Sequence, residues 1–232
     1  MALFIVATPI GNLGDITPRA VSTLSNVDLI LAEDTRVTRT LLEHYNIKKE
    51  LLGYHQHSGR GIIEKVINRL KEGQDIALVS DAGTPGINDP GNFLIQEILK
   101  ELPDLKIVGL PGPNTAILAL SISGFPTDKF MFLGFPPHKK GRQTFFRNIE
   151  AVPYTVVLYE SKHRIVKALE QLAPLGRPLI VCRELTKQFE TTYRGQAEEI
   201  LTKLVGNNLL GEFVVVIGPK PKKVKSEPDE EK

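Results

Sequence analysis

Residues 76–91 read Ile-Ala-Leu-Val-Ser-Asp-Ala-Gly-Thr-Pro-Gly-Ile-Asn-Asp-Pro-Gly, a short apolar run followed by a long loop rich in glycine and proline. The run Ile76–Ser80 is typical of a strand buried on both faces of a parallel sheet. The loop after it exceeds the roughly 2–6 residues that usually join a strand to a helix. Long, stiff loops at strand ends are more often functional than ordinary connections. The alternative is an ordinary loop that ends in the cap of the next helix.

The side chains and glycines of this loop indicate a ligand site. Asp81 stands at the end of the strand, where it could accept a hydrogen bond from a ligand hydroxyl or amine. Gly83, Gly86 and Gly91 could expose backbone N–H groups to a carboxylate.

Two more strand ends carry similar loops. Thr8–Asp15 follows the first apolar run, and Leu110–Ala116 follows a later one. Neither matches the Gly-x-Gly-x-x-Gly motif of dinucleotide-binding folds, and no phosphate-binding P-loop motif is present. Pro113 favours a helix start whose N–H groups suit an anion, although Pro-Gly-Pro alone is equally typical of a simple turn. All three loops are expected at the carboxyl edge of one sheet, where open α/β folds bind ligands.

The alternation of short apolar runs with amphipathic stretches predicts an α/β fold. Strands are expected at Leu3–Ala7, Leu29–Ala32, Ile76–Ser80 and Ile107–Leu110, with helices opening at Thr17-Pro18 and Asp89-Pro90 and a third spanning Ile62–Leu70. A basic segment rich in proline and glycine, 124–142, then indicates a junction to a second α/β unit. That unit is expected to hold strands at Thr155–Tyr159, Leu179–Cys182 and Phe213–Ile217 and helices at Arg164–Leu172 and Ala197–Leu204. The expected division is 1–123, 124–218 and a disordered tail, 219–232.

Composition limits the class of protein. The chain has 232 residues, 41% of them hydrophobic, and a net charge of +2, so any RNA-binding surface must gather its basic residues locally. Cys182 is the single cysteine and is expected to be a buried core residue rather than a nucleophile. No disulfide can form within the chain, and neither a signal peptide nor a membrane span is expected, so we predict a cytoplasmic protein.

Several of these stretches together resemble one family. Ala7–Leu13, Glu33–Arg36, Ser80–Gly91, Leu110–Asn114 and Tyr159–Arg164 resemble the ribosomal RNA small subunit methyltransferase I branch of the tetrapyrrole methylases. The resemblance extends from about Leu3 to Ile217, and the Ser80–Gly91 block is its most specific part. Tetrapyrrole-specific branches usually open with a loop like Gly-x-Gly-Pro-Gly-Asp, whereas this chain has Thr8–Leu13, which favours the RNA branch.

The resemblance implies a fold, a cofactor and a reaction. It implies a class III methyltransferase of two α/β domains, with S-adenosylmethionine in the cleft between them, that methylates the 2′-hydroxyl of a cytidine ribose in small-subunit (16S) ribosomal RNA. It also implies a homodimer that acts on this RNA or on the 30S subunit. The implied cofactor-binding residues are Pro9, Gly11, Asn12, Asp81, Ala82, Gly83, Thr84, Pro111, Gly112, Asn114, Thr115 and Ala116.

A ribose 2′-hydroxyl is a poor acid, so a base or a nearby cation should assist the transfer. Glu160 and Glu184 are candidates to take the proton, and Lys162 could lower the pKa of the hydroxyl. His163 is a weaker candidate base. The alternative for each is a helix cap or a surface ion pair. No cluster of His, Asp and Glu has metal-ligand spacing, so no metal site is predicted.

Contacts with RNA require exposed cations, because phosphate contacts supply most non-specific affinity. The residues expected to meet phosphate are Arg36, Arg39, Lys139, Lys140, Arg142, Arg164 and Arg183. A cap of the following helix is the alternative for Asp34 or Thr35. Two other functions remain open from sequence: a methyltransferase on a tetrapyrrole precursor or another small molecule, and a non-catalytic RNA-binding assembly factor.

Overall fold

A computed structural model describes residues 1–55 and 58–220, so the expected tail lies outside the described residues from position 221 onwards. The chain divides into two compact units, Met1–Thr115 and a second that begins at Ala116. Within the described ranges, no helix is long and apolar enough to cross a membrane.

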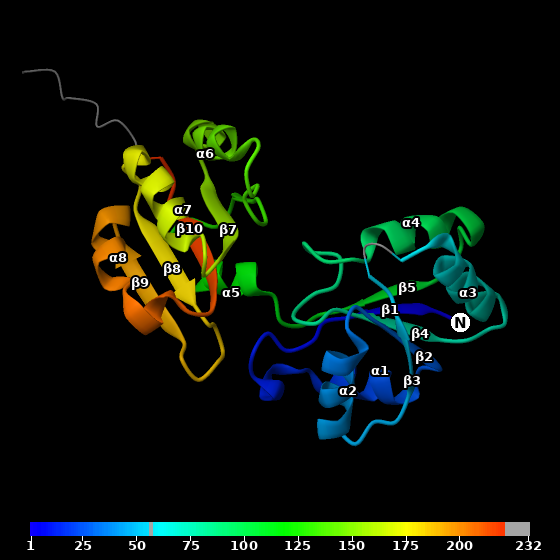
Figure 1. Ribbon diagram of the computed structural model, residues 1–232. Coiled ribbons are helices and arrows are strands. Elements are labelled where there is room, and N and C mark those ends of the chain that lie inside the picture. Colours follow the sequence, from blue (N-terminus) through cyan, green and yellow to red (C-terminus); the bar gives the residue numbers. More distant parts are fainter. Residues whose placement is uncertain (56–57, 221–232) are drawn as a thin grey trace, which may run out of the picture. The chain divides into compact units, whose positions relative to one another are not determined.

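The first unit is built on a five-stranded parallel sheet in the order β3-β2-β4-β1-β5 (Figure 1). Its strands are β1 (Leu3–Val6), β2 (Leu29–Ala32), β3 (Glu50–Gly53), β4 (Ile76–Val79) and β5 (Ile107–Leu110). The buried residues of β2 and β4 confirm strands covered on both faces. Because every strand runs in the same direction, the loops after β1, β2, β4 and β5 lie at one edge of the sheet.

Helices cover both faces of this sheet (Figure 1). Helices α1 (Pro18–Asn26) and α2 (Thr35–His44) pack on one face, while α3 (Arg60–Lys71) and α4 (Asn92–Glu101) pack on the other. A short 3₁₀ helix, η1 (Leu13–Asp15), precedes α1. Successive side chains of β1 enter the two cores in turn, as the period of two in a strand requires.

The expected helix starts are confirmed in one case and wrong in another. Thr17 caps α1 by accepting a hydrogen bond from the Ala20 N–H, with Pro18 at the first helical position. The start expected at Asp89-Pro90 is wrong, because α4 begins at Asn92. Gly91 occupies the N-cap position of α4, where no side chain makes a cap hydrogen bond.

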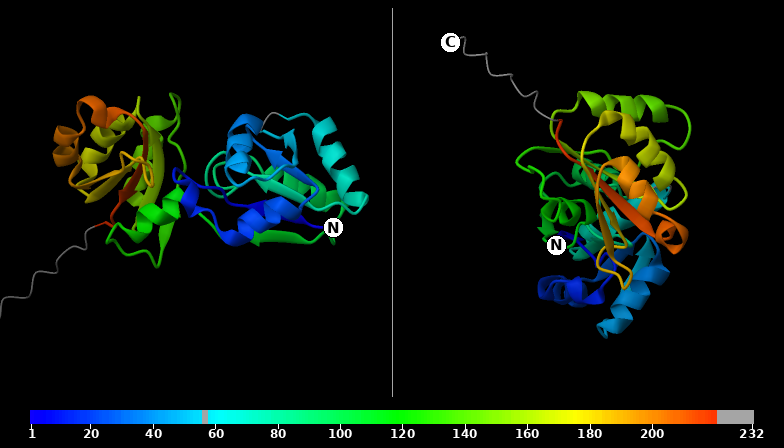
Figure 2. Two further views of the ribbon diagram at one scale, coloured as in Figure 1. Left: turned by 90° about the horizontal axis from the view of Figure 1, so that it is seen from below. Right: turned by 90° about the vertical axis from the view of Figure 1, so that its left-hand side faces the viewer.

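The second unit is built on a mixed five-stranded sheet in the order β6-β7-β10-β8-β9 (Figures 1 and 2). Its strands are β6 (Phe130–Phe132), β7 (Thr155–Ser161), β8 (Leu179–Arg183), β9 (Thr191–Gly195) and β10 (Glu212–Ile217). Only the β6–β7 pair is parallel, and the other three pairs are antiparallel.

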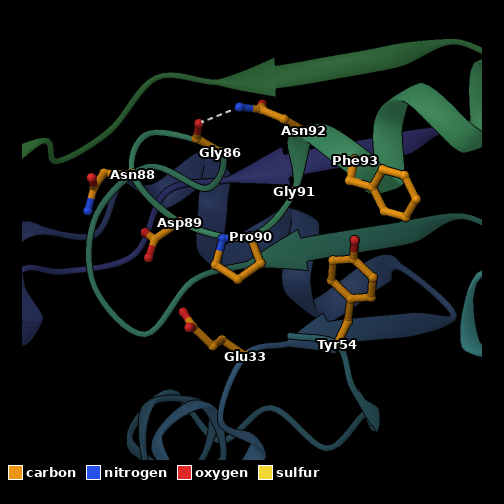
Figure 3. Close-up of a pocket in the computed structure, with 9 residues that line it drawn as sticks. All are labelled: Glu33, Tyr54, Gly86, Asn88, Asp89, Pro90, Gly91, Asn92 and Phe93. Atoms are coloured by element: carbon orange, nitrogen blue, oxygen red, sulfur yellow. Dashed lines mark hydrogen bonds between the residues drawn. The ribbon is translucent and has the colours of Figure 1, made fainter. Parts of the chain in front are cut away.

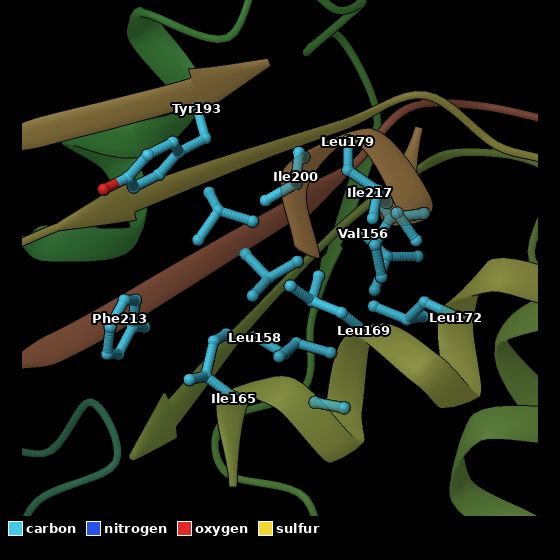
Figure 4. Packing of buried hydrophobic residues seen from close by; sticks show 14 of the residues in the cluster. Val156, Leu158, Ile165, Leu169, Leu172, Leu179, Tyr193, Ile200, Phe213 and Ile217 are labelled. Atoms are coloured by element: carbon cyan, nitrogen blue, oxygen red, sulfur yellow. The ribbon is translucent and has the colours of Figure 1, made fainter. Parts of the chain in front are cut away.

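One apolar core joins this sheet to three helices, α6 (Arg142–Ala151), α7 (Ile165–Leu172) and α8 (Ala197–Lys203). Figure 4 shows side chains of β7, β8 and β10 meeting those of α7, with Ile200 of α8 beside them. Two 3₁₀ helices complete the unit, η2 (Ala173–Leu175) and η3 (Gly206–Leu209). Alternate residues of β7, Val156 and Leu158, face this core, which places Glu160 on the same side of the strand.

The structure differs from the sequence-based division at the junction between the units. Helix α5 (Thr115–Ser121) belongs almost wholly to the second unit, so the boundary lies after Thr115 and not after residue 123. The Arg194 guanidinium of β9 donates a hydrogen bond of 2.8 Å to the Ile122 carbonyl, just beyond α5. This contact ties the segment after α5 to the second sheet.

The buried state of Cys182 gives a testable prediction. The residue is 1% exposed, and burial raises the pKa of its thiol to about 11, so the thiol is protonated at neutral pH. We expect alkylation at pH 8 to be far slower in the folded protein than in denaturant, as followed by intact mass spectrometry. Because Cys182 is the single cysteine, the mass shift reports this site alone. Equal rates in both states would contradict the buried placement.

Candidate active site

Backbone hydrogen bonds join the loop after β1 to the loop after β4. The Thr8 N–H donates to the Gly83 carbonyl at 2.9 Å, and the Gly83 N–H donates to the Thr8 carbonyl at 3.1 Å. This pair forms an isolated antiparallel bridge just beyond two parallel strands. The two predicted cofactor loops are therefore held together at one edge of the sheet.

Two buried hydroxyls stabilise the same junction. The Thr8 hydroxyl donates to the Ser80 carbonyl at 3.0 Å, and the Ser80 hydroxyl donates to the Gly83 carbonyl at 3.1 Å. Both residues are at most 3% exposed, so these bonds satisfy carbonyls that water does not reach readily.

The third loop, after β5, joins the other two through close backbone contacts. The Thr84 hydroxyl donates to the Pro113 carbonyl at 2.9 Å. A Cβ atom at Gly112 would lie 2.7 Å from the Ala7 Cβ, closer than real Cβ contacts occur. Gly83 has φ +84°, and its Cβ would meet Ile10 at 3.3 Å. The glycines of these loops therefore allow three chain segments to converge.

Asn12 has a local role in this site. Its side chain accepts a hydrogen bond of 3.0 Å from the Gly14 N–H and caps the 3₁₀ helix η1. This is the turn-forming role that its residue type suggests. It fixes the course of the first loop.

A fourth strand end lies beside this group of loops. The Asp34 N–H donates to a carboxylate oxygen of Asp81 at 2.9 Å, which links the loop after β2 to the loop after β4. Asp34 itself caps α2 by accepting from the Arg36 N–H, so the helix-cap alternative is confirmed for this residue. Hydrogen bonds from Arg36 lower the pKa of the Asp34 carboxyl to about 2. Arg36 and Arg39 are both exposed on α2.

A pocket of about 690 Å³ opens between the loop after β4 and the end of β2 (Figure 3). It is lined by Glu33, Tyr54, Gly86, Asn88, Asp89, Pro90, Gly91, Asn92 and Phe93. The Asn92 amide donates to the Gly86 carbonyl at 3.0 Å and so closes one wall. The pocket combines carboxyl, amide and aromatic groups, a mixture that suits a polar ligand with an aromatic ring.

Two carboxyl groups of this pocket are perturbed. Burial, then the charges of Asp89 and Asp81, raise the pKa of Glu33. Burial likewise raises the pKa of Asp89. Neither residue is among the catalytic residues predicted from the sequence. The sequence feature that could have identified Glu33 is the acidic pair Glu33-Asp34 at the end of a buried strand, a position where ligand contacts are common.

The charged residues of the second unit differ most from expectation. Glu160 is 1% exposed, and its carboxylate pairs with Arg142 at 2.9 Å and with Arg164 at 3.0 Å. This placement does not fit a direct proton-accepting role, because the carboxylate is enclosed and already paired with two guanidinium groups. It also contradicts an RNA contact by Arg142, whose side chain is only 5% exposed. The Arg164 side chain is 17% exposed and is engaged in the same group.

Arg183 is likewise an internal residue, 7% exposed. Its guanidinium donates to the carbonyls of Leu210, Phe189 and Asn207. This contradicts the expected phosphate contact, because the guanidinium fixes the loops around β8 and β10.

Glu184, the second proposed base, is half-buried. Burial alone would raise the pKa of its carboxyl, but hydrogen bonds from the Glu212 N–H and Lys187 lower it below the ordinary value. A lowered pKa makes this carboxylate a weaker base.

Four of the predicted cations remain available at the surface. Lys139 and Lys140 are exposed just before α6, as Arg36 and Arg39 are on α2. Lys162, the proposed electrostatic catalyst, is also exposed, in the turn after β7. In the described parts of the chain, no group of three or more His, Cys, Asp or Glu could hold a metal ion.

A parallel sheet with converging glycine loops at its carboxyl edge, followed by a mixed sheet, defines a class of methyltransferase. The family model of the tetrapyrrole (corrin/porphyrin) methylases matches residues 2–201, and the chain belongs to that family. Solved structures agree on the fold. A cobalt precorrin-4 methyltransferase aligns with a TM-score of 0.67 at 17% identity, covering 94% of each chain. Diphthine synthase aligns with a TM-score of 0.68 at 12% identity, covering 94% of this chain and 90% of that one.

Sequence relatives define the branch within the family. Ribosomal RNA small subunit methyltransferase I of Escherichia coli O157:H7 is 47% identical over 221 residues, which cover 93% of this chain and 77% of that protein. The enzyme of the same name from Thermotoga maritima is 41% identical over 220 residues, covering 94% and 98% respectively. The chain therefore belongs to the ribosomal RNA small subunit methyltransferase I branch.

The residues at the loop edge suit S-adenosylmethionine, the methyl donor of this family. Asp81 presents an exposed carboxylate, which could accept hydrogen bonds from an ammonium group or a ribose hydroxyl. Gly112 brings the third loop against the first, where a side chain would fill the space between them. Ala82 and Gly112 are exposed, so their backbone groups are accessible to a ligand.

The contact between Gly112 and Ala7 gives a second prediction. We expect Gly112→Ala to destabilise the protein by about 1–3 kcal/mol and to weaken S-adenosylmethionine binding, because the new methyl group must push two loops apart. Chemical denaturation and titration calorimetry measure the two effects. Gly109→Ala is the matched control, since a Cβ at that position meets no atom within 4 Å. Equal behaviour of the two variants would contradict the close contact.

Proposed function

We propose that this protein transfers a methyl group from S-adenosylmethionine to the 2′-hydroxyl of a cytidine ribose in small-subunit (16S) ribosomal RNA. The observation that carries the proposal is the 41–47% identity to several proteins named ribosomal RNA small subunit methyltransferase I, over more than nine-tenths of the chain. The loops that the resemblance implies for the cofactor converge at one sheet edge, which supports the same reaction.

When bound, the cofactor supplies an already activated methyl group. The chain's own residues therefore have to orient the two substrates, enclose them and accept the proton of the ribose hydroxyl. The interlocked loops restrict their own motion before any ligand binds. Such pre-organisation contributes to catalysis because alignment can account for roughly 7–11 kcal/mol of a barrier. The cofactor contacts remain part of this proposal, at Pro9, Gly11, Asn12, Asp81, Ala82, Gly83, Thr84, Pro111, Gly112, Asn114, Thr115 and Ala116.

We further propose Glu33 as the group that receives the proton of the ribose hydroxyl. It lines the pocket, and the Asp34 N–H next to it bonds to Asp81 of the second loop. Burial and the neighbouring carboxylates raise its pKa, which makes its ionised form a stronger base than an ordinary glutamate. Lys162 remains our proposal for electrostatic assistance.

The partners follow from this reaction. The exposed Arg36, Arg39, Lys139 and Lys140 are proposed to meet RNA phosphates. We propose that the substrate is the RNA itself or the assembled 30S subunit, that the protein acts in the cytoplasm, and that it forms a homodimer. The dimer can be tested by light scattering.

The decisive experiment supplies labelled S-adenosylmethionine to small subunits from a strain that lacks this methylation, with free RNA and a tetrapyrrole precursor in parallel reactions. Label in a cytidine ribose supports the proposal. Label only in the tetrapyrrole precursor would show that the substrate is a small molecule and not RNA. Cofactor binding without any transfer would favour an RNA-binding assembly factor.

Glu33→Gln tests the proposed base. We expect the single-turnover rate to fall by about 10²–10⁴-fold while S-adenosylmethionine affinity holds, because the amide keeps the shape but cannot accept a proton. In the unmodified protein, the rate should rise with pH as Glu33 ionises, at a pH above the ordinary range of a glutamate. This limb should be absent in the variant. Glu43→Gln, at an exposed position of α2, is the control. A Glu33→Gln variant with the full rate and pH profile would exclude this role.

A further inference from the structure

A buried ionic network in the second unit is not accounted for by the proposed reaction. Glu160 is at its centre, with a side chain that is 0% exposed. One carboxylate oxygen accepts from the Arg142 guanidinium at 2.9 Å. The other lies 3.0 Å from Nε of Arg164 and accepts from the Ser161 N–H at 2.8 Å. A single anion thus holds two guanidinium groups and one backbone amide.

The two arginines extend this network to the backbone in front of α6. Arg164 Nη1 donates to the Pro136 carbonyl at 3.1 Å, and Arg142 Nη1 approaches the next carbonyl, that of Pro137, at 3.4 Å. Arg142 Nε also donates to the Gln171 side chain of α7 at 2.9 Å. The network therefore fixes two consecutive peptide groups against β7 and α7.

Both segments that the network holds continue into exposed basic residues. Pro137 is followed by His138, Lys139 and Lys140, and Ser161 is followed by Lys162 and His163, all of them exposed. Glu160 belongs to β7, and the segment before α6 comes from an earlier part of the sequence. One buried carboxylate thus sets the positions of two cationic segments.

A network of this kind is a weak source of stability. Desolvating three charged groups costs several kcal/mol per ion, and apolar residues of similar volume often stabilise a protein as well or better. What the network supplies is defined geometry, because each guanidinium has donors in a fixed plane and binds a carboxylate and a carbonyl together.

We propose that Glu160, Arg142 and Arg164 are positioning residues that hold the segments 138–140 and 162–163 so that their cations meet the phosphates of the RNA substrate together. The inference rests on the proposed function and assigns to it a means of substrate binding. None of the three residues touches RNA; they act through the backbone that they hold.

The direction in which RNA affinity changes for Glu160→Gln distinguishes a positioning role from simple electrostatic attraction. Glu160→Gln removes a negative charge, so electrostatic attraction alone predicts tighter binding of RNA by the more positive protein. Positioning predicts weaker binding, because the amide cannot hold both guanidinium groups. Glu170→Gln makes the same change in net charge at an exposed position of α7 and is the matched control.

The experiment measures the affinity of the full-length protein for undermethylated small-subunit RNA at several salt concentrations. The slope of log affinity against log salt is negative, and each lost phosphate contact reduces its magnitude by about 0.7–0.9. We expect the magnitude of this slope to fall by the equivalent of one to two phosphate contacts for Glu160→Gln and for the double variant Lys139→Gln/Lys140→Gln. We expect no such fall for Glu170→Gln. Adding Glu160→Gln to the double variant should weaken RNA binding less than it does in the unmodified protein, because the double variant has already lost Lys139 and Lys140.

Kinetics provide a readout that a general loss of structure would not reproduce. For Glu160→Gln, we expect KM for RNA to rise while the affinity for S-adenosylmethionine, which binds elsewhere in the proposed site, holds. If Glu160→Gln does not fold, as judged by circular dichroism, Arg164→Lys serves instead. It keeps the charge, but its single ammonium group lacks the planar donors that bind Glu160 and Pro136 together.

RNA binding by a folded Glu160→Gln variant that is as tight as that of Glu170→Gln, or tighter, would overturn the inference. So would unchanged RNA binding by Arg164→Lys where that variant replaces it. Failure of the proposed function gives a different result, because the unmodified protein would then not methylate this RNA.

Discussion

The reciprocal pair of backbone hydrogen bonds between Thr8 and Gly83 is the contact on which the candidate site depends. It closes the gap between two strands of a parallel sheet just where their hydrogen-bonded ladder ends. The chain can pass so closely only because Gly83 has a positive φ and Gly112 has no side chain. The hydroxyls of Thr8, Ser80 and Thr84 then satisfy the carbonyls that this close approach leaves inside. Ordered loops of this kind have little conformational entropy left to lose when a ligand binds.

The two units use charge in different ways. In the first unit, Glu33 and Asp89 line the same open pocket, and their raised pKa values suit proton transfer. In the second, Glu160 is enclosed and paired with two guanidinium groups. The same residue type is therefore a candidate base in one environment and a fixed internal partner in the other. Burial alone does not decide between these roles; the sign of the neighbouring charges does.

Much of the fold could be predicted from the sequence, and the reasons for the misses are physical. Strands such as Leu29–Ala32 were predicted because they are apolar on both faces, which a covered parallel sheet requires. β3, β6 and β9 were missed because they are edge strands with little buried apolar surface. The three site loops were identified because glycine and proline mark unusual backbone. The roles of Arg142, Arg183 and Glu160 were misjudged, because a charged residue near a strand end gives no sign of whether it faces solvent or an internal partner.

The hydrogen bond from the Asp34 N–H to Asp81 has a consequence for how the first unit can respond to a ligand. Asp34 is also the residue that caps α2, the helix that carries Arg36 and Arg39. A shift of Asp81 towards a bound molecule therefore changes the partner of the residue that begins this helix. By thermodynamic reciprocity, a force applied to α2 by a bound polyanion would alter the affinity at Asp81 by the same factor. A single amide proton shared between two loops thus links the binding of the two substrates in the first unit.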